Sequence, residues 1–263
     1  MVNLTMKNKL IFKLLVLFTA QAFSFQLAAN TSADRKAEND LQEVYQLKYI
    51  EREPGIDAYE TVMLVSDRYI RIDETGEDGG FIVYDDEKKT IYSVGHQDKS
   101  ILVIDQLEFS EENSPVKAHV EYLKLADAPT VSGKHVFNYR VFVKTGAAVV
   151  DEEETCTDIH LVEGLLPEVR NILQNYQKVV SGQQVRMTDN KITEMQTSCF
   201  YADQIYNSGA YYEKGLPVQE WHSNNRSKIL TTYRKVSVAS DKFNIPEDYR
   251  QFSIGKDPEI PIQ

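Results

Sequence analysis

The feature that most constrains the fold of this chain is a period of two in its apolar residues. Tyr45, Leu47 and Tyr49 alternate with polar neighbours, and the same pattern returns over residues 59–65 and 68–72. Successive side chains of a β-strand point to opposite sides, so this alternation is typical of strands that bury one face. We therefore expect a mainly β (α+β) fold.

Further apolar segments follow at short intervals, separated by charged or Gly-containing turns. Short connections favour antiparallel pairing between consecutive strands, which predicts a meander. These segments are residues 81–84, 90–94, 100–104, 116–125 and 135–144.

The apolar period changes after Pro167, where helical spacing begins. Pro is favoured at the first position of a helix, and Gly182 is predicted to end this helix in a left-handed conformation. A second, weaker helical stretch is predicted from about Ser198 to Tyr206, and a closing hairpin is predicted at residues 216–238 around Asn224-Asn225. The apolar positions of the first helix are Val169, Ile172, Leu173, Tyr176, Val179 and Val180.

Residues 1–29 have the pattern of a cleavable signal peptide. Three lysines precede an apolar run from Leu14 to Phe25, and Leu27-Ala28-Ala29 provides small residues for cleavage. The run is well short of the roughly 20 residues that a membrane-spanning helix needs. No cysteine lies near the cleavage site to carry a lipid. The pattern predicts a periplasmic or secreted protein, with Met1 or Met6 as the start.

The expected organisation after the leader is simple. Residues 30–40 are polar and predict a flexible N-terminus, residues 41–252 a single β domain, and residues 253–263 a C-terminal tail. The two helical stretches form an insertion at about residues 160–210.

The chain is acidic, with a formal net charge of −11. This charge repels nucleic acids and anionic membrane surfaces and argues against both as partners. The clustered acids, such as those of residues 151–154, are typical of solvated loops.

Cys156 and Cys199 are the only cysteines. In an exported chain such a pair predicts one disulfide. A metal site is the alternative, because Asp158 and His160 closely follow Cys156.

Catalytic signatures are missing from the sequence. It has no Gly-x-Ser-x-Gly, no zinc-peptidase His pair and no phosphate loop, and its five histidines are scattered singly. We therefore assign no catalytic residue, no metal ligand and no cofactor.

The many aromatic residues support two interpretations. Inward-facing Tyr and Phe most often form ordinary core, but they can also line an apolar cavity for a lipid-like ligand inside a curved sheet. Under the second interpretation the candidate ligand-binding residues are Ile172, Leu173, Tyr176, Tyr201, Tyr211 and Trp221.

Three segments carry a resemblance to a known group of proteins. Residues 80–92, 215–221 and 243–249 resemble the LolA-like superfamily and the neighbouring DUF4412-type group of uncharacterised bacterial exported proteins. The resemblance implies a half-open antiparallel β-barrel with helices covering its concave face. The superfamily includes periplasmic carriers that shield lipoprotein acyl chains, and lipid-binding relatives.

Three functional hypotheses follow. The first is a periplasmic, non-catalytic protein that binds a hydrophobic or lipid-like ligand between the sheet and residues 167–180. The second is a cell-envelope interaction or assembly module with a packed core, whose protein partner is unknown and which uses an edge strand or the 216–238 hairpin. The third is an unrecognised hydrolase.

Overall fold

The computed structural model describes residues 40–73, 79–107, 114, 116–145, 152–188 and 197–253. The predicted signal peptide lies outside the described residues, as do nearly all of the predicted flexible N-terminus and C-terminal tail. No helix in the described ranges is long and apolar enough to cross a membrane.

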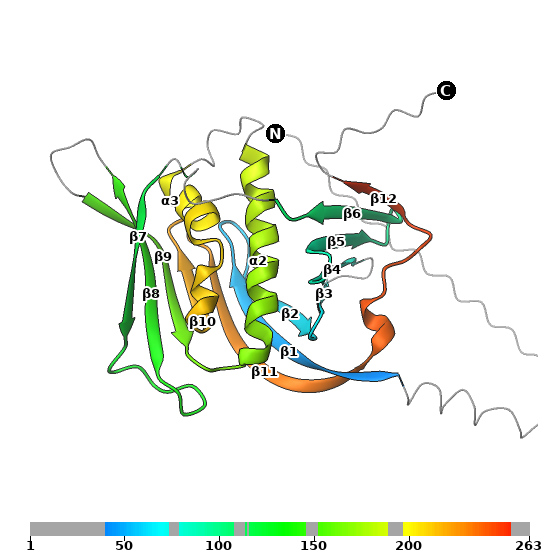
Figure 1. Ribbon diagram of the computed structural model, residues 1–263, viewed down its shortest axis with the longest axis horizontal. Helices are drawn as coiled ribbons and strands as arrows, with labels where there is room; N and C mark the ends of the chain where they lie inside the picture. The colour runs from blue at the N-terminus through cyan, green and yellow to red at the C-terminus, as the bar shows by residue number, and fades with distance from the viewer. Residues whose placement is uncertain are drawn as a thin grey trace, which may run out of the picture. The chain divides into compact units, whose positions relative to one another are not determined.

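The described residues form one large, open β-sheet (Figure 1). Its strand order is β12-β6-β5-β4-β3-β2-β1-β11-β10-β9-β8-β7, and all neighbours are antiparallel except β12 and β6. The predicted mainly β class is confirmed. The strands are β1 (Leu41–Arg52), β2 (Tyr59–Val65), β3 (Tyr69–Asp73), β4 (Phe81–Asp85), β5 (Thr90–Gly95), β6 (Ser100–Asp105), β7 (Ala118–Lys124), β8 (Val136–Thr145), β9 (Glu152–Val162), β10 (Leu216–His222), β11 (Ser227–Ala239) and β12 (Arg250–Ser253).

Two antiparallel sets of strands meet at the pairing of β1 with β11. β1 continues into β2–β6, whereas β11 continues into β10–β7. β1 and β11 pair over their whole lengths, from Leu41 opposite Ala239 to Arg52 opposite Ser227. The first described strand is therefore joined to the eleventh of the twelve described strands.

The longest helix, α2 (Pro167–Thr188), lies on one face of the sheet, which bends around it (Figure 1). It begins at Pro167 as predicted. The predicted end at Gly182 is wrong, because α2 continues for more than a turn beyond it. Gly182 and its neighbour Ser181 are buried within a continuous helix.

Shorter helical segments connect α2 to β10. They are α3 (Ser198–Tyr201), the π-helix η3 (Ala202–Asn207) and the 3-10 helix η4 (Ala210–Glu213), and a further 3-10 helix, η5 (Ser240–Phe243), follows β11. The helical stretch predicted from Ser198 to Tyr206 is confirmed.

The core lies between α2 and the sheet. Val169, Ile172, Leu173 and Val179 of α2 are at most 3% exposed and pack into one cluster with inward side chains of both strand sets. The ring of Tyr176 meets that of Tyr84 on β4 at a centroid distance of 5.7 Å. Burial of this apolar face holds α2 against the sheet.

Strand β9 was not predicted from the sequence. The acidic residues 152–154 were expected in a solvated loop, but they begin this strand. These residues pair with the last residues of β8, and Lys144 of β8 is opposite Glu153. Opposite charges across a strand pair stabilise the sheet and explain why an acidic segment is extended here.

Candidate functional site

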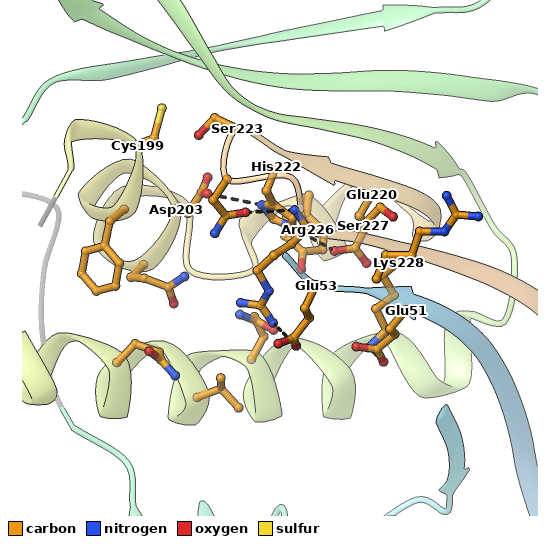
Figure 2. A pocket seen from close by; sticks show the side chains of 18 of the residues that line it. Glu51, Glu53, Cys199, Asp203, Glu220, His222, Ser223, Arg226, Ser227 and Lys228 are labelled. Atoms are coloured by element: carbon orange, nitrogen blue, oxygen red, sulfur yellow. Dashed lines mark hydrogen bonds and ion pairs between the residues drawn. The ribbon is translucent and has the colours of Figure 1, made fainter. Parts of the chain in front are cut away.

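A cavity of about 470 Å³ opens between α2, the α3–η3 segment and the hairpin of β10 and β11 (Figure 2). Its wall is mostly polar and carries carboxylates, cations, amides and hydroxyls, with Phe200, Tyr211 and Tyr212 as aromatic members. Its volume lies within the range of about 300–1,000 Å³ that is usual for small-molecule pockets.

Three charged side chains reach the cavity from adjacent strands of the sheet. Lys228 on β11 is paired with Glu51 on β1 and with Glu220 on β10, so the three residues form a row across the strands. The Nζ atom of Lys228 lies 3.2 Å from a carboxylate oxygen of Glu51. The register of the sheet thus places one glutamate on each side of Lys228, on the two neighbouring strands.

Glu220 is the most deeply buried of these groups. It is only 7% exposed, and no hydrogen bond from another described residue holds its carboxyl group. Its closest described cation is the Nε2 atom of His222, 4.0 Å away. Burial raises the pKa of Glu220, while the positive charges of Lys228 and His222 oppose this effect.

His222 belongs to a polar network that joins three elements. Its Nδ1 atom lies 3.3 Å from Oδ2 of Asp203 on η3 and 3.1 Å from Oγ1 of Thr157 on β9. Thr157 also donates a hydrogen bond to Asp203. Burial alone would lower the pKa of His222, but the hydrogen bond and charge of Asp203 outweigh it, so the pKa is raised.

The predicted disulfide between Cys156 and Cys199 is confirmed, with a Cα–Cα distance of 4.9 Å. It joins β9 to α3, the same two segments that supply Thr157 and Asp203. Thr157 directly follows Cys156, and Asp203 lies one helical turn after Cys199. The disulfide therefore holds these two polar side chains within reach of His222. Figure 2 shows Asp203 beside His222.

Because both cysteines are in this disulfide, the alternative metal site at Cys156 is wrong. His160 instead contacts the side chain of Gln219 at 3.0 Å. In the described part of the chain, no group of three His, Cys, Asp or Glu side chains is arranged to hold a metal ion.

Arg226 in the turn of the hairpin is also paired. It lies 3.3 Å from Glu53 (Figure 2). Glu53 in turn accepts a hydrogen bond of 3.1 Å from the hydroxyl of Tyr59. The turn that carries Arg226 is closed by a hydrogen bond from the Asn225 amide to the His222 carbonyl, and Asn225 has a φ of 64°. Asn tolerates this left-handed conformation, which confirms the predicted turn.

The structure separates the residues that the sequence placed around a ligand. The core contains Ile172 and Leu173, and Tyr176 packs against it. Of the six predicted residues, only Tyr211 lines the cavity. Tyr201 packs against Phe200, with ring centroids 5.6 Å apart. Trp221 is 37% exposed and meets the ring of His160.

Glu220 and His222 were not predicted as site residues, because Trp221, on the other face of β10, was predicted to contact the ligand. Trp221 lies between them, and neighbouring side chains on a strand point to opposite faces. The aromatic ring was taken as the ligand-facing group, whereas the cavity receives Glu220 and His222. A simple period counted from Leu216 did not signal this, because a bulge between Pro217 and Gln219 shifts the register of β10 against β9.

No protein-family model matches this chain, and no curated protein sequence matches it either. An uncharacterized conserved protein from Thermus thermophilus is similar in structure, with 8% identity and a TM-score of 0.38 over 85% of this chain and 99% of that protein.

The second similar structure is PNGF-II in its C2 crystal form, with 8% identity and a TM-score of 0.36. Its P21 form gives 7% identity and a TM-score of 0.35. The matches cover 82% and 81% of this chain but only 31% and 32% of the PNGF-II chains, so the chain spans about a third of their length. Similarity at this level assigns neither a family nor a function to the chain.

Proposed function

We propose that the protein is an exported, non-catalytic binding protein whose ligand is a small polar molecule held in the 470 Å³ cavity. The observation that carries this proposal is the buried carboxyl group of Glu220 on the cavity wall. A largely buried ionisable group that faces a cavity is costly to charge, and such groups concentrate at functional sites. A ligand that hydrogen-bonds to Glu220 would offset this cost.

Binding is better supported than hydrolysis by the geometry around His222. In a nucleophilic triad the nucleophile contacts one ring nitrogen and the acid contacts the other. Here Thr157 and Asp203 both contact Nδ1. Thr157 is therefore not placed to pass a proton to the other side of the ring.

A polar ligand is also better supported than the apolar ligand expected from the sequence. Ile172 and Leu173 are 3% and 2% exposed, so the space between the first half of α2 and the sheet is occupied by their own packing. The open volume lies beside the charged row instead. Export through a signal peptide and the LolA-like, half-open barrel architecture with a covering helical insertion remain part of this proposal.

Native mass spectrometry of protein purified from its own cell envelope without detergent tests the proposal. We expect a reproducible additional mass that is lost in the Glu220→Ala variant. The matched control is Glu43→Ala, because Glu43 is an exposed glutamate on β1, away from the cavity. An apoprotein mass alone, in the unmodified protein, would contradict the proposal.

The assembly-module hypothesis is the second candidate, supported by the exposed end of the sheet at β7. β7 pairs only with β8 among the described strands, and its Leu123 is 61% exposed. An unpaired edge strand is a surface on which a partner strand can add. A photo-crosslinking residue at position 123 should capture one reproducible envelope protein in intact cells, and the same residue at the exposed position 43 should not.

A further inference from the structure

The cavity wall also indicates which chemical class of ligand it takes, and this inference rests on the proposed function. We infer that the ligand is an uncharged sugar, bound by planar polar side chains and by the ring of Phe200.

The charges of the wall are largely balanced within the protein. Of its four cationic residues, three are within 3.3 Å of a carboxylate that also lines the cavity: His222 with Asp203, Arg226 with Glu53, and Lys228 with Glu51. The fourth, Arg52, is exposed at the end of β1. A phosphate or carboxylate ligand would have to break these pairs, so a strongly anionic ligand is disfavoured.

A cationic ligand is disfavoured for a different reason. Glu220 is the carboxyl group of the wall without an ion pair in hydrogen-bonding range, and its burial penalises the charged form that a cation would need. A carboxyl group accepts a hydrogen bond from a ligand hydroxyl in either protonation state.

Amide side chains add further dual donors and acceptors from the helical side of the cavity. Gln177 and Gln184 come from α2 and Gln204 from η3. The Oε1 atom of Gln204 is buried and has no hydrogen-bond partner among the described residues, so turning this amide toward a ligand would break no bond at that oxygen. Planar amides and carboxyls can contact two neighbouring hydroxyls at once, which matches the vicinal hydroxyls of a sugar ring.

Phe200 supplies an apolar surface next to these polar groups. It lines the cavity from α3 and is only partly buried, and its backbone amide is held by Oγ1 of Thr197 at 3.1 Å. The face of an aromatic ring carries partial negative charge, and the C–H bonds on one face of a sugar ring carry partial positive charge. The two surfaces are therefore complementary. The cavity volume of about 470 Å³ is sufficient for a mono- or disaccharide.

The test is isothermal titration calorimetry of the purified, oxidised protein with two sets of probes. The sugar set contains glucose, galactose, mannose, N-acetylglucosamine and their common disaccharides. The other set contains lysine, inorganic phosphate and decanoate. We expect at least one uncharged sugar to bind and the other set not to bind.

Variants of Phe200 separate ring stacking from simple apolar contact. Phe200→Leu keeps an apolar side chain but removes the ring, and should weaken sugar binding by roughly 3- to 10-fold. Phe200→Tyr keeps the ring and should bind like the unmodified protein. Equal affinity of the Leu and Tyr variants would overturn the inference.

The outcomes distinguish this inference from the proposed function. Binding of only lysine, phosphate or decanoate would overturn the sugar assignment and leave a binding function in place. If no probe binds and native mass spectrometry of the envelope-purified protein shows apoprotein alone, both are overturned.

Discussion

Oδ2 of Asp203 lies 3.3 Å from Nδ1 of His222, across the junction between η3 and β10. The contact connects a helical segment that precedes β10 to the last residue of that strand. It stabilises the protonated imidazole and is the main reason why the pKa of His222 is raised despite burial.

The first prediction is a pH-dependent stability contribution from this pair. Because the folded-state pKa of His222 is raised, the contribution is complete below the unfolded value of about 6.5 and is lost as pH rises through the folded-state pKa. The variant Asp203→Asn lacks it. Urea unfolding between about pH 5 and pH 9 should therefore show the largest loss of stability in this variant at the acidic end.

The control for this prediction is Asp127→Asn, which changes an exposed aspartate on another part of the chain. It should follow the unmodified protein at every pH. A constant difference between Asp203→Asn and the unmodified protein across the pH range would contradict the assigned linkage.

The second prediction concerns the disulfide. Cys156 and Cys199 are 43 residues apart, and closing a loop of this length stabilises a protein by about 4 kcal/mol in the chain-entropy model. The double variant Cys156→Ala/Cys199→Ala should lose about this free energy of unfolding. It should also lower the pKa of His222 toward its ordinary value, as measured by NMR titration, because α3 and η3 are no longer tied to β9. Reductant should reproduce the loss in the unmodified protein and have no effect on the variant.

The third prediction is that Glu220 lowers stability. Its pKa is raised by burial, so its ionisation opposes folding: the cost is absent below the unfolded pKa of about 4.3 and grows as pH rises to the folded-state pKa. Glu220→Gln should therefore raise the free energy of unfolding at pH 7, by about 1 kcal/mol. Thermal unfolding measures this, and Glu43→Gln should leave the midpoint unchanged.

The fourth prediction tests whether Leu173 of α2 serves the core and not the ligand site. Leu173 is 2% exposed within the main core cluster. Leu173→Ala should lower the free energy of unfolding by about 3 kcal/mol through lost burial and a cavity, without changing the additional mass in native mass spectrometry. Asn171→Ala, at an exposed position of the same helix, should change neither. Loss of the bound mass in a folded Leu173→Ala protein would return the ligand to the space between α2 and the sheet.

Much of the fold could be predicted because it depends on local patterns. The alternation at Tyr45–Tyr49 and Tyr59–Val65 identified β1 and β2, and helical spacing after Pro167 identified α2. The end of α2 was placed too early because Gly182 was taken as a helix end, whereas it is buried within a helix that continues to Thr188. β9 was missed because its acidic start looks like a loop until β8 supplies Lys144 opposite it.

Of the candidate site, only the disulfide could be predicted from the sequence. Two cysteines in a chain expected to be exported indicated the disulfide, and it is present. The contact of Asp203 with His222 and the row of Glu51, Lys228 and Glu220 depend on strand order and register. Glu51 and Lys228 are far apart in the sequence, and neither segment gives a local sign that the two will be neighbours. The sequence pattern did not contain this information.

The junction of β1 with β11 also determines when the protein can finish folding. The centre of the sheet requires residues 227–239, which leave a ribosome or a translocation channel only after β1–β10 have done so. Until then β1 has β2 on one side and an unpaired edge on the other. A chain crossing a membrane from its N-terminus would thus keep this sheet incompletely folded and threadable until β11 had emerged, and the edge of β1 would need protection from aggregation during that interval.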